Sequence, residues 1–410
     1  MYCFLSQVKN HHQRLTAKFC YSPKHISISH ILLVNLTFWA YALVVSASPN
    51  GSLLQISPGA RASGMGEVQT ALLDPMAGHF NAGSMGIYSL DNNFSFAYSG
   101  TDWLKGWWNS DLYIDHAQLF TGWKLAEKTE DNSTEISCGI DFGRRLFDLG
   151  ETERRGENNE YLGMFEAWER NYSAGASIGL RNIIEIGVGI KFNYLSSNLL
   201  SYENNPPIVD EESIQTYDWG VMIRLPLSNA LSELYSIDPN ILVSPFKIDV
   251  IPSFGYSRSN QGGNIRDPLL KINREGYALE TRFDLPDISL LAFIYAQDFK
   301  MERYFPAQMG WNEISGIGRE IVFFDSFIYR WGEYYDEKHL DSRVTTGFTM
   351  QTRGILKIIY IVSQNQEWAR GNRYEFVMNR VNIRYSRSSW EGTYNNILDT
   401  TEWVEFGISF

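Results

Sequence analysis

The stretch IIEIGVGIKFNY, residues 183–194, alternates apolar side chains with glycine, glutamate, lysine and asparagine. Its apolar residues fall at the even positions from Ile184 to Tyr194, and the small or polar residues fall between them. A period of two residues is typical of a β-strand, whose successive side chains point to opposite faces. The stretch therefore predicts a strand with one apolar face, and the fold depends on what surrounds each face.

The same alternation returns from residue 93 to residue 410. It is clear in NFSFAYS (93–99), EISCGIDFG (135–143), YDWGVMIRL (217–225) and TEWVEFGISF (401–410). About fourteen such stretches can be distinguished, and an even number of strands is the rule for single-chain barrels of the bacterial outer membrane. They begin near residues 93, 110, 134, 172, 184, 213, 246, 276, 288, 319, 342, 355, 373 and 401.

The faces opposite the apolar ones carry mainly Gly, Ser, Ala and Asn with scattered charges. In a soluble sandwich these faces would meet bulk water and would be rich in Lys, Glu and Thr. Small residues with a few charges instead suit the enclosed interior of a barrel. The pattern therefore predicts an all-β chain that forms a transmembrane antiparallel β-barrel. Seven tryptophans near strand ends are predicted to form the interfacial girdles: Trp103, Trp107, Trp108, Trp123, Trp311, Trp331 and Trp403.

The last predicted strand finishes on a phenylalanine. Alternation places Val404, Phe406, Ile408 and Phe410 on one face, which lipid would cover. A final strand that ends on Phe resembles the signal by which barrel-assembly machinery recognises its clients. The resemblance implies that machinery and outer-membrane lipid as partners, with Phe406, Ile408 and Phe410 as the candidate signal.

The connections between predicted strands differ in length. Arg181-Asn182 and Pro286-Asp287 are predicted to be tight turns, and Arg353-Gly354 another. If the first strand runs outward from a periplasmic N-terminus, four long polar segments lie outside the cell, as is usual for these barrels. These segments are residues 146–171, 198–212, 258–275 and 301–318. Two connections break the rule: the turn at Arg353-Gly354 would lie outside, and the long segment 227–245 would lie inside.

Residues 1–47 have the features of a secretory signal peptide. They contain no Asp or Glu, and a basic leader precedes the apolar run ILLVNLTFWAYALVV (31–45) and the small-residue site Val45-Ser46-Ala47. This order predicts export with cleavage after Ala47. Together with the barrel pattern, it predicts a location in the outer membrane of a Gram-negative-type bacterium. An N-terminal membrane anchor is the alternative interpretation.

Charge and cysteine content exclude several classes of function. Loss of the four basic residues of the leader changes the net charge from −12 to −16, which argues against a nucleic-acid partner. Only Cys138 would remain, so an intrachain disulfide is impossible. The three remaining histidines, His79, His116 and His339, form no metal-like motif. No cofactor, metal or catalytic residue is predicted; a lipase-type Ser–His pair would depend on spatial proximity, and no spacing supports one.

Residues 58–86, PGARASGMGEVQTALLDPMAGHFNAGSMG, do not alternate and are too rich in Gly for a helix throughout. The part VQTALL (68–73) permits at most a short helix. Such a segment before a barrel predicts a plug inside the lumen. The expected organisation is a signal peptide at 1–47, a plug at 48–92 and a barrel at 93–410.

The same segment resembles the start of the PorV/PorQ group of outer-membrane proteins, which belongs with the FadL-type fatty-acid channels. That group begins with a pattern close to GARAxGMGxAxxALxDDxxAxxxNPAG. The residues that match are Gly59-Ala60-Arg61-Ala62, Gly64-Met65-Gly66, Ala71-Leu72, Asp74 and Asn81. Two positions depart from the pattern: the second acidic residue is Pro75, and Asn-Pro-Ala-Gly is replaced by Asn81-Ala82-Gly83-Ser84.

The resemblance implies a plugged barrel of about fourteen strands without catalytic activity. PorV-like members act in type IX secretion, where they hold folded cargo and pass it to the translocon or to the surface attachment complex. FadL-like members instead admit long-chain fatty acids or other hydrophobic molecules through a gated lumen. The first role is our interpretation, with secreted cargo and type IX components as partners, and the second remains the alternative.

Six residues of the plug are candidates for contact with a ligand or with the wall: Arg61, Met65, Asp74, His79, Phe80 and Asn81. Arg61 and Asp74 could bind a carboxylate of cargo or substrate, but salt bridges that dock the plug explain them more simply. The charged stretch 146–161 is interpreted as a solvated outer loop or a protein-recognition surface. The aromatic stretch YRWGEYYDE (329–337) is interpreted as girdle or binding platform.

Overall fold

The computed structural model of the chain describes most residues after residue 51. The described ranges are 52–54, 56–103, 112–127, 134–155, 158–201, 208–235, 247–262, 269–285, 288–303, 311–337, 341–363, 377, 381–392 and 401–410. The predicted leader and the predicted turn at Pro286-Asp287 lie outside them, so both stay predictions.

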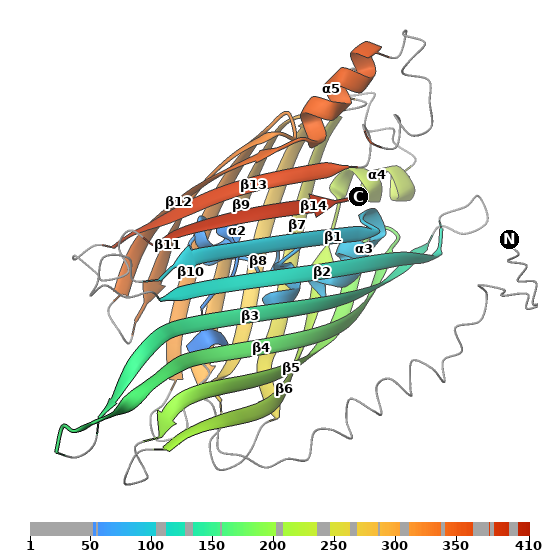
Figure 1. Cartoon of the computed structure of the whole chain (residues 1–410). Helices are drawn as coiled ribbons and strands as arrows, with labels where there is room; N and C mark the ends of the chain where they lie inside the picture. Colours follow the sequence, from blue (N-terminus) through green and yellow to red (C-terminus); the bar gives the residue numbers. More distant parts are fainter. Residues whose placement is uncertain are drawn as a thin grey trace, which may run out of the picture. The chain divides into compact units, whose positions relative to one another are not determined.

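Fourteen antiparallel strands close into a barrel, as the alternation predicts (Figure 1). Each strand pairs with its neighbours in chain order, and β1 pairs with β14 to complete the ring. Closure leaves no open sheet edge, which is what a β-structure needs in lipid. The strands are β1 (Phe94–Asp102), β2 (Tyr113–Ala126), β3 (Glu135–Arg155), β4 (Tyr161–Arg181), β5 (Glu185–Ser201), β6 (Ile208–Arg224), β7 (Lys247–Gly262), β8 (Lys271–Asp284), β9 (Ser289–Arg303), β10 (Trp311–Phe323), β11 (Phe327–Asp336), β12 (Asp341–Gln351), β13 (Asn382–Gly392) and β14 (Glu402–Ser409).

The predicted number of strands is right although two assignments are wrong. The single strand predicted from residue 319 is a hairpin of β10 and β11, with positive φ angles at Phe324 (53°) and Asp325 (48°) in the turn. The strand predicted from residue 355 is the helix α5 (Arg353–Ser363), so no tight turn joins two strands at Arg353-Gly354. Both stretches are apolar without clear alternation, so the local period could not show where a strand ends.

The two ends of the barrel differ. We call the end that holds Phe94 and Phe410 the terminal end; it lies toward the right in Figure 1 and also carries α4 (Leu227–Tyr235) and α5. At the opposite, loop end, strands β3 to β6 extend far beyond β1 (Figure 1). The segments 146–171 and 198–212, which were predicted to be loops, are therefore largely strand. Their sequences mix many polar and charged residues with irregularly spaced apolar ones, so they lack the alternation by which the wall is recognised.

The outer face of the wall is apolar. Ile184, Val188 and Ile190, which the opening stretch places on one face, are all exposed, whereas Lys191 is buried inside. Phe406, Ile408 and Phe410 are exposed on the same outer face of the last strand, as predicted. Exposed aliphatic and aromatic residues over a closed barrel form the surface that hydrocarbon covers.

The tryptophan girdle is only partly as predicted. Trp123 is exposed on the outer face, but Trp403 is fully buried and points inward. Trp103 also packs inside the barrel, with its ring 5.9 Å from that of Trp390. Trp107, Trp108 and the side chain of Trp311 lie outside the described part of the chain.

The described helices are short: besides α4 and α5 they include α2 (Ala60–Ser63) and α3 (Ser84–Asp91). None of the helices among the described residues has the length and apolar composition to cross a bilayer.

Candidate functional site

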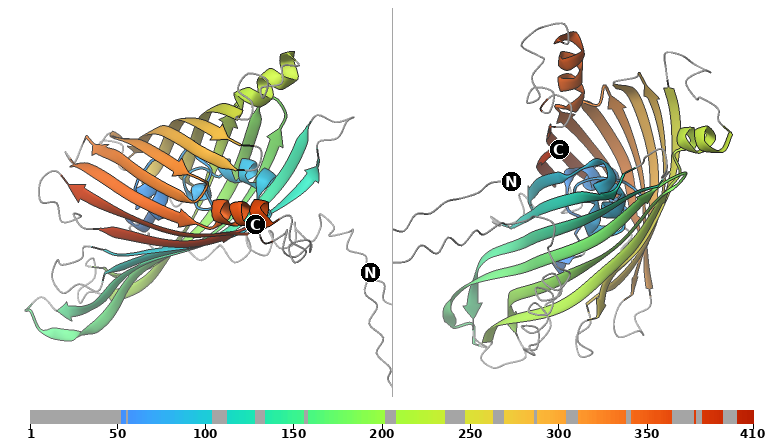
Figure 2. Two further views of the ribbon diagram at one scale, coloured as in Figure 1. Left: turned by 90° about the horizontal axis from the view of Figure 1, so that it is seen from above. Right: turned by 90° about the vertical axis from the view of Figure 1, so that its right-hand side faces the viewer.

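Residues 52–54 and 56–92 lie within the ring of strands, and we call them the lumenal segment (Figure 2). It starts near the loop end, where the backbone N–H of Leu53 donates to Glu169 (2.8 Å). It finishes at the terminal end, and the next residue, Asn93, donates to the carbonyl of Phe410 (2.9 Å). The segment therefore runs through the barrel from one end to the other before β1 begins. The boundary of the predicted plug at residue 48 lies outside the described residues.

The segment has little regular structure. Its helical parts are η1 (Ser52–Leu54), α2, η2 (Ala77–His79) and α3. The short helix allowed for VQTALL does not form, and residues 68–73 make turns and irregular backbone instead. The reason lies in the wall, because this part is held by hydrogen bonds to Asp298, whose carboxylate accepts from the N–H groups of Gln69 and Thr70 (both 2.8 Å).

The backbone of the segment touches the wall at inward-facing glycines. A Cβ at Gly187 would overlap the carbonyl of Gly83, and a Cβ at Gly255 would overlap the carbonyl of Thr70. We call the wall residues that meet the backbone of the segment in this way the glycine track. They come from β4, β5, β7, β10 and β11 and are Gly179, Gly187, Gly189, Gly255, Gly316, Gly318 and Gly332.

The motif residues lie on this contact surface. Position 66 requires glycine for two reasons: its φ is 67°, and a Cβ there would overlap the backbone of Glu333. Met65 is fully buried against Gly318. The side-chain amide of Asn81 donates to the carbonyls of Thr70 (3.0 Å) and Val221 (2.9 Å), so it joins two parts of the segment to β6.

Phe80 and His79 occupy a buried corner beside β2, β3 and β7. The carbonyl of Phe80 accepts a hydrogen bond from the hydroxyl of Ser257 (2.7 Å). Arg145 donates to Nε2 of His79 (2.7 Å), and the ring of His79 lies 5.7 Å from that of His116. Burial, together with the positive charge of Arg145, lowers the pKa of His79 well below its usual value, so the imidazole is neutral.

Arg61 and Asp74 form buried ion pairs with the opposite part of the wall. Arg61 pairs with Glu320 (3.0 Å) and also donates to the carbonyl of Leu73 (2.6 Å). Arg330 shares the same Glu320 carboxylate. A single buried carboxylate therefore holds two guanidinium groups, one from the segment and one from β11.

Asp74 accepts from Arg384 of β13 (2.7 Å), and Arg384 also pairs with Glu405 of β14. Burial by itself would raise the pKa of Asp74, but the guanidinium groups of Arg384 and Arg61 outweigh that effect and hold the pKa below its usual value. Asp74 is therefore ionised at neutral pH. The two pairs tie residues 61–74 directly to β10 and β13, and Arg330 and Glu405 extend the network to β11 and β14.

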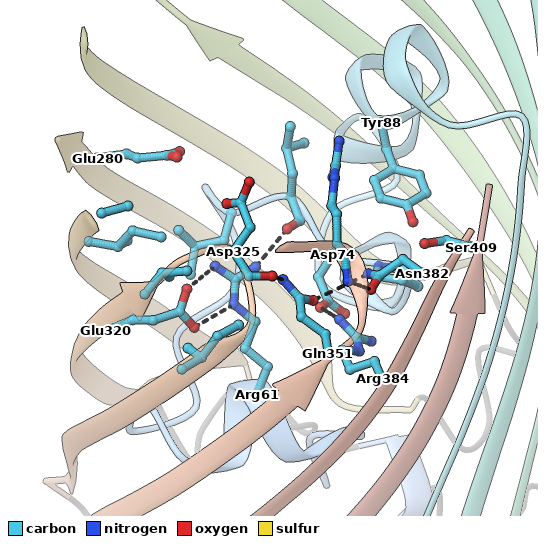
Figure 3. Close-up of a pocket in the computed structure, with 18 of the residues that line it drawn as sticks. Arg61, Asp74, Tyr88, Glu280, Glu320, Asp325, Gln351, Asn382, Arg384 and Ser409 are labelled. Atoms are coloured by element: carbon cyan, nitrogen blue, oxygen red, sulfur yellow. Dashed lines mark hydrogen bonds and ion pairs between the residues drawn. The ribbon is translucent and has the colours of Figure 1, made fainter. Parts of the chain in front are cut away.

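A cavity of about 440 Å³ lies among these pairs at the terminal end, and we call it the ionic cavity (Figure 3). Six arginines and five acidic residues line it, so its surface is strongly polar but nearly balanced in charge. Figure 3 shows Arg61, Asp74, Glu320 and Arg384 facing one another across it. The charged lining residues are Arg61, Asp74, Asp91, Arg224, Glu280, Arg282, Glu320, Asp325, Arg330, Arg353 and Arg384.

The loop end of the lumen has the opposite character. Leu53 and Leu54 of the segment pack with inward side chains of the wall, among them Trp390 and Trp403, in one buried apolar cluster. The alternation in TEWVEFGISF itself places Trp403 on the face opposite Val404 and Phe406, which agrees with its buried position and not with a place in the girdle. The partners of Leu53 and Leu54 could not be found from the sequence, because they lie on strands far away along the chain.

All six candidate residues of the plug therefore lie inside the barrel with contacts to the wall or within the segment. These contacts bring Arg61 and Asp74 to the ionic cavity, whereas His79 and Phe80 lie in the separate buried corner. Glu320, Arg330, Arg384 and Glu405 complete the ionic site and were not predicted. In the described residues, no group of three His, Cys, Asp or Glu side chains could hold a metal ion.

No protein-family model matches the chain, and no curated protein matches it. Among solved structures, the toluene transporter TodX of Pseudomonas putida is 10% identical; the match covers 86% of this chain and 96% of TodX, with a TM-score of 0.38. The toluene transporter TbuX of Ralstonia pickettii is 11% identical over 87% of this chain and 98% of its own, with a TM-score of 0.34. The β domain of the Bordetella autotransporter BrkA is 8% identical over 78% and 98%, with a TM-score of 0.33.

With scores this low, the fold is established by the strand pairing of the chain itself. Every strand has two antiparallel partners, and the exposed side chains of the wall are aliphatic and aromatic. In water such a surface would be a large aggregation-prone patch, whereas in lipid it is the expected one. The chain is a multi-pass β-barrel of the outer membrane.

Proposed function

We propose that this protein is a non-enzymatic outer-membrane barrel of PorV/PorQ type that serves in type IX protein secretion or in surface attachment of cargo. The observation that carries the proposal is the fit of the lumenal segment. The segment with the family-like motif meets the wall through backbone contacts at the glycine track, so the lumen is occupied by the chain itself. A barrel filled in this way is suited to act as a rigid holder rather than as a passage.

The two ends of the lumen support the same role. Leu53, Leu54, Trp390 and Trp403 pack together at the loop end, so any route past them would have to break a buried apolar cluster. At the terminal end the ionic cavity is lined by charges, most of which are paired. A hydrophobic molecule gains nothing by entering such a cavity, because it would separate ion pairs without replacing their partners. The alternative, a channel for fatty acids or other hydrophobic molecules, would require both obstacles to move.

The extended parts of β3 and β4 supply a surface for protein recognition at the loop end. Glu151, Glu153 and Arg155 are exposed there, and Arg155 pairs with Glu153 (2.5 Å). Exposed charges mainly determine the rate and specificity of encounter with a partner. We infer that this charged hairpin is where a secreted protein is first met.

The test is recovery of secreted protein with the tagged barrel from native outer membranes. We expect cargo to copurify with the wild-type chain and to fall several-fold in the double variant Glu153→Ala, Arg155→Ala. The matched control is Lys124→Ala with Glu135→Ala, which removes an ion pair (2.6 Å) at the opposite end of the barrel and should leave recovery unchanged.

A second measurement separates the competing role. The purified barrel is reconstituted in vesicles and assayed for uptake of a long-chain fatty acid. Uptake by the barrel, combined with no secreted protein in the copurification, would reject the secretion role and favour the channel.

A further inference from the structure

The helix α5 is an apolar element that the barrel leaves uncovered. Ile355, Ile358, Ile359 and Val362 are all exposed, with Val362 at 76%. Their spacing of three, four and seven residues places them on one face of the helix. A helix of eleven residues is marginal in water on its own, and an exposed row of isoleucines makes water still less favourable.

The base of α5 is fixed to the barrel by contacts with the turn between β10 and β11. The N–H of Ile355 donates to the hydroxyl of Ser326 (3.0 Å), and Lys357 pairs with Asp325 (3.6 Å) in the turn between β10 and β11. Gly354 lies so close to that turn that a Cβ would overlap the carbonyl of Phe324. The rest of the helix extends away from the rim of the barrel (Figures 1 and 2). Something other than the wall must therefore cover its apolar face.

The surface at the base of α5 indicates what that cover is. Phe324, Phe327, Met350 and Ile383 surround the base on neighbouring strands and turns, and all are exposed on the outer face of the wall. The apolar face of α5 thus continues the surface that lipid covers on the barrel. This continuity favours lipid over water as the environment of the helix.

The polar face of the helix agrees with a membrane surface. Arg353, Lys357 and Tyr360 share that face at spacings of four and seven residues, and residues 353–363 contain no acidic side chain. Basic residues opposite a broad aliphatic face are typical of helices that lie at the boundary between headgroups and acyl chains. Energetic centres of protein interfaces, in contrast, are enriched in Trp, Tyr and Arg rather than in aliphatic rows.

We propose that α5 is a membrane-interface helix. Its aliphatic face enters the acyl layer of the leaflet at the terminal end, and its polar face is turned toward the rim, where Lys357 pairs with Asp325 and Arg353 lines the ionic cavity. The helix thereby anchors the rim between β12 and β13 to one leaflet and fixes the depth of the barrel in the bilayer. This role is independent of the proposed part in secretion.

Spin labels on α5 test the proposal directly. The chain is reconstituted in vesicles of phosphatidylethanolamine and phosphatidylglycerol, with Cys3, Cys20 and Cys138 replaced by Ser. Single labels are placed at Ile358→Cys and Val362→Cys on the apolar face and at Tyr360→Cys on the polar face. Ile178→Cys provides the lipid reference, because Ile178 is an exposed residue of the outer wall, and Glu153→Cys provides the water reference.

The measured quantity is the ratio of the collision rate with oxygen to that with a water-soluble nickel chelate. We expect this ratio at positions 358 and 362 to be several-fold higher than at Glu153→Cys and close to that at Ile178→Cys, with position 360 between the two references. Heat-modifiable electrophoretic mobility confirms that each variant is folded, and Ile359→Cys replaces Ile358→Cys on the same face if the latter fails to fold.

Two results would overturn the proposal. A ratio at positions 358 and 362 equal to the water reference would place the helix in the aqueous phase. Low collision rates with both reagents would show that protein covers the helix instead, and dilution with unlabelled chain would then distinguish a second copy from a different partner.

Discussion

The glycine track and the ionic cavity hold the same lumenal segment to the same wall in different ways. At the track, backbone lies against backbone, as at Gly187 and Gly83, and the surfaces leave no room for a side chain. At the cavity, side chains such as Arg61 and Glu320 reach across space. The difference shows that the inward glycines of the wall form a surface against which the backbone of the lumenal segment packs directly. The charged residues instead connect the segment to the wall where the two are separated by the ionic cavity.

The largest expected effect on stability is at Glu320, beside the ionic cavity. Glu320→Gln leaves the buried guanidinium groups of Arg61 and Arg330 without their shared anion. Removal of one partner of a buried ion pair costs about 3–5 kcal/mol. We expect the free energy of unfolding, measured by urea titration in lipid vesicles, to fall by this amount.

The matched control for that variant is Arg387→Gln. Arg387 of β13 pairs with Glu402 of β14 (2.7 Å) but is half exposed, so its loss should have little effect on the free energy of unfolding. Equal losses of unfolding free energy in the two variants would show that the buried carboxylate of Glu320 does not stabilise the contact between the segment and the wall.

The second-largest effect on stability is expected at the glycine track. Gly187→Ala places a methyl group against the carbonyl of Gly83, and neither backbone can move without disturbing the sheet or the segment. Overpacking of this kind costs about 1–3 kcal/mol. The same change at Gly407, which lines the ionic cavity and whose nearest neighbour would lie 3.4 Å from the new Cβ, should be nearly neutral.

A different result for Gly187→Ala and Gly407→Ala would contradict the distinction between the glycine track and the ionic cavity. Should both unfold at the same urea concentration as the wild type, the segment would not be seated on the glycine track as described. Proteolysis of the segment in the folded barrel provides a second readout, because a displaced segment becomes accessible to protease.

Asp74→Asn should have a smaller effect than Glu320→Gln. Arg384 loses one of its two carboxylate partners but keeps Glu405, so no buried charge is left without an anion. We expect a loss of about 1–2 kcal/mol in the free energy of unfolding at neutral pH. Because the folded pKa of Asp74 is lowered, its contribution is present above the unfolded pKa and disappears as the pH falls through the folded value.

The pH profile therefore checks this prediction independently of its magnitude. The wild type and Asp74→Asn should differ at pH 7 and converge in acid. A difference that stayed constant down to the acid limit would assign the effect to packing rather than to charge.

The comparison also shows what the sequence could reveal. Alternation identified the outer face correctly at Ile184, Val188 and Phe406, because exposure to lipid imposes a local period on each strand. It failed at residues 319–331, where apolar residues lie on both sides of the turn and hide the hairpin, and at α5, whose apolar residues recur with a helical period that a search for two-residue alternation does not detect.

The partners across the lumen were beyond the sequence for a different reason. Residues such as Arg61 and Glu320 are separated by 259 positions, and their pairing depends on which strands lie opposite the segment. The high content of glycine and serine on the faces opposite the apolar ones did indicate an enclosed interior. It could not distinguish an open lumen from one fitted to the chain.

The smallest expected effect concerns His79, which lies away from both the track and the cavity. Its pKa is lowered by burial and by Arg145, so protons bind the unfolded chain more readily than the folded one. The stability that neutral His79 contributes is complete above the unfolded pKa of about 6.5 and declines as the pH falls below that value. One pH unit below it, the loss approaches about 1 kcal/mol.

His79→Gln keeps an acceptor for Arg145 and should reduce the loss of stability between pH 7.5 and pH 5.5 by that amount, measured by urea unfolding at each pH. An unchanged slope would mean that His79 is solvated in the folded barrel, and the corner it shares with Phe80 would then belong with the ionic cavity rather than with the packed part of the lumen.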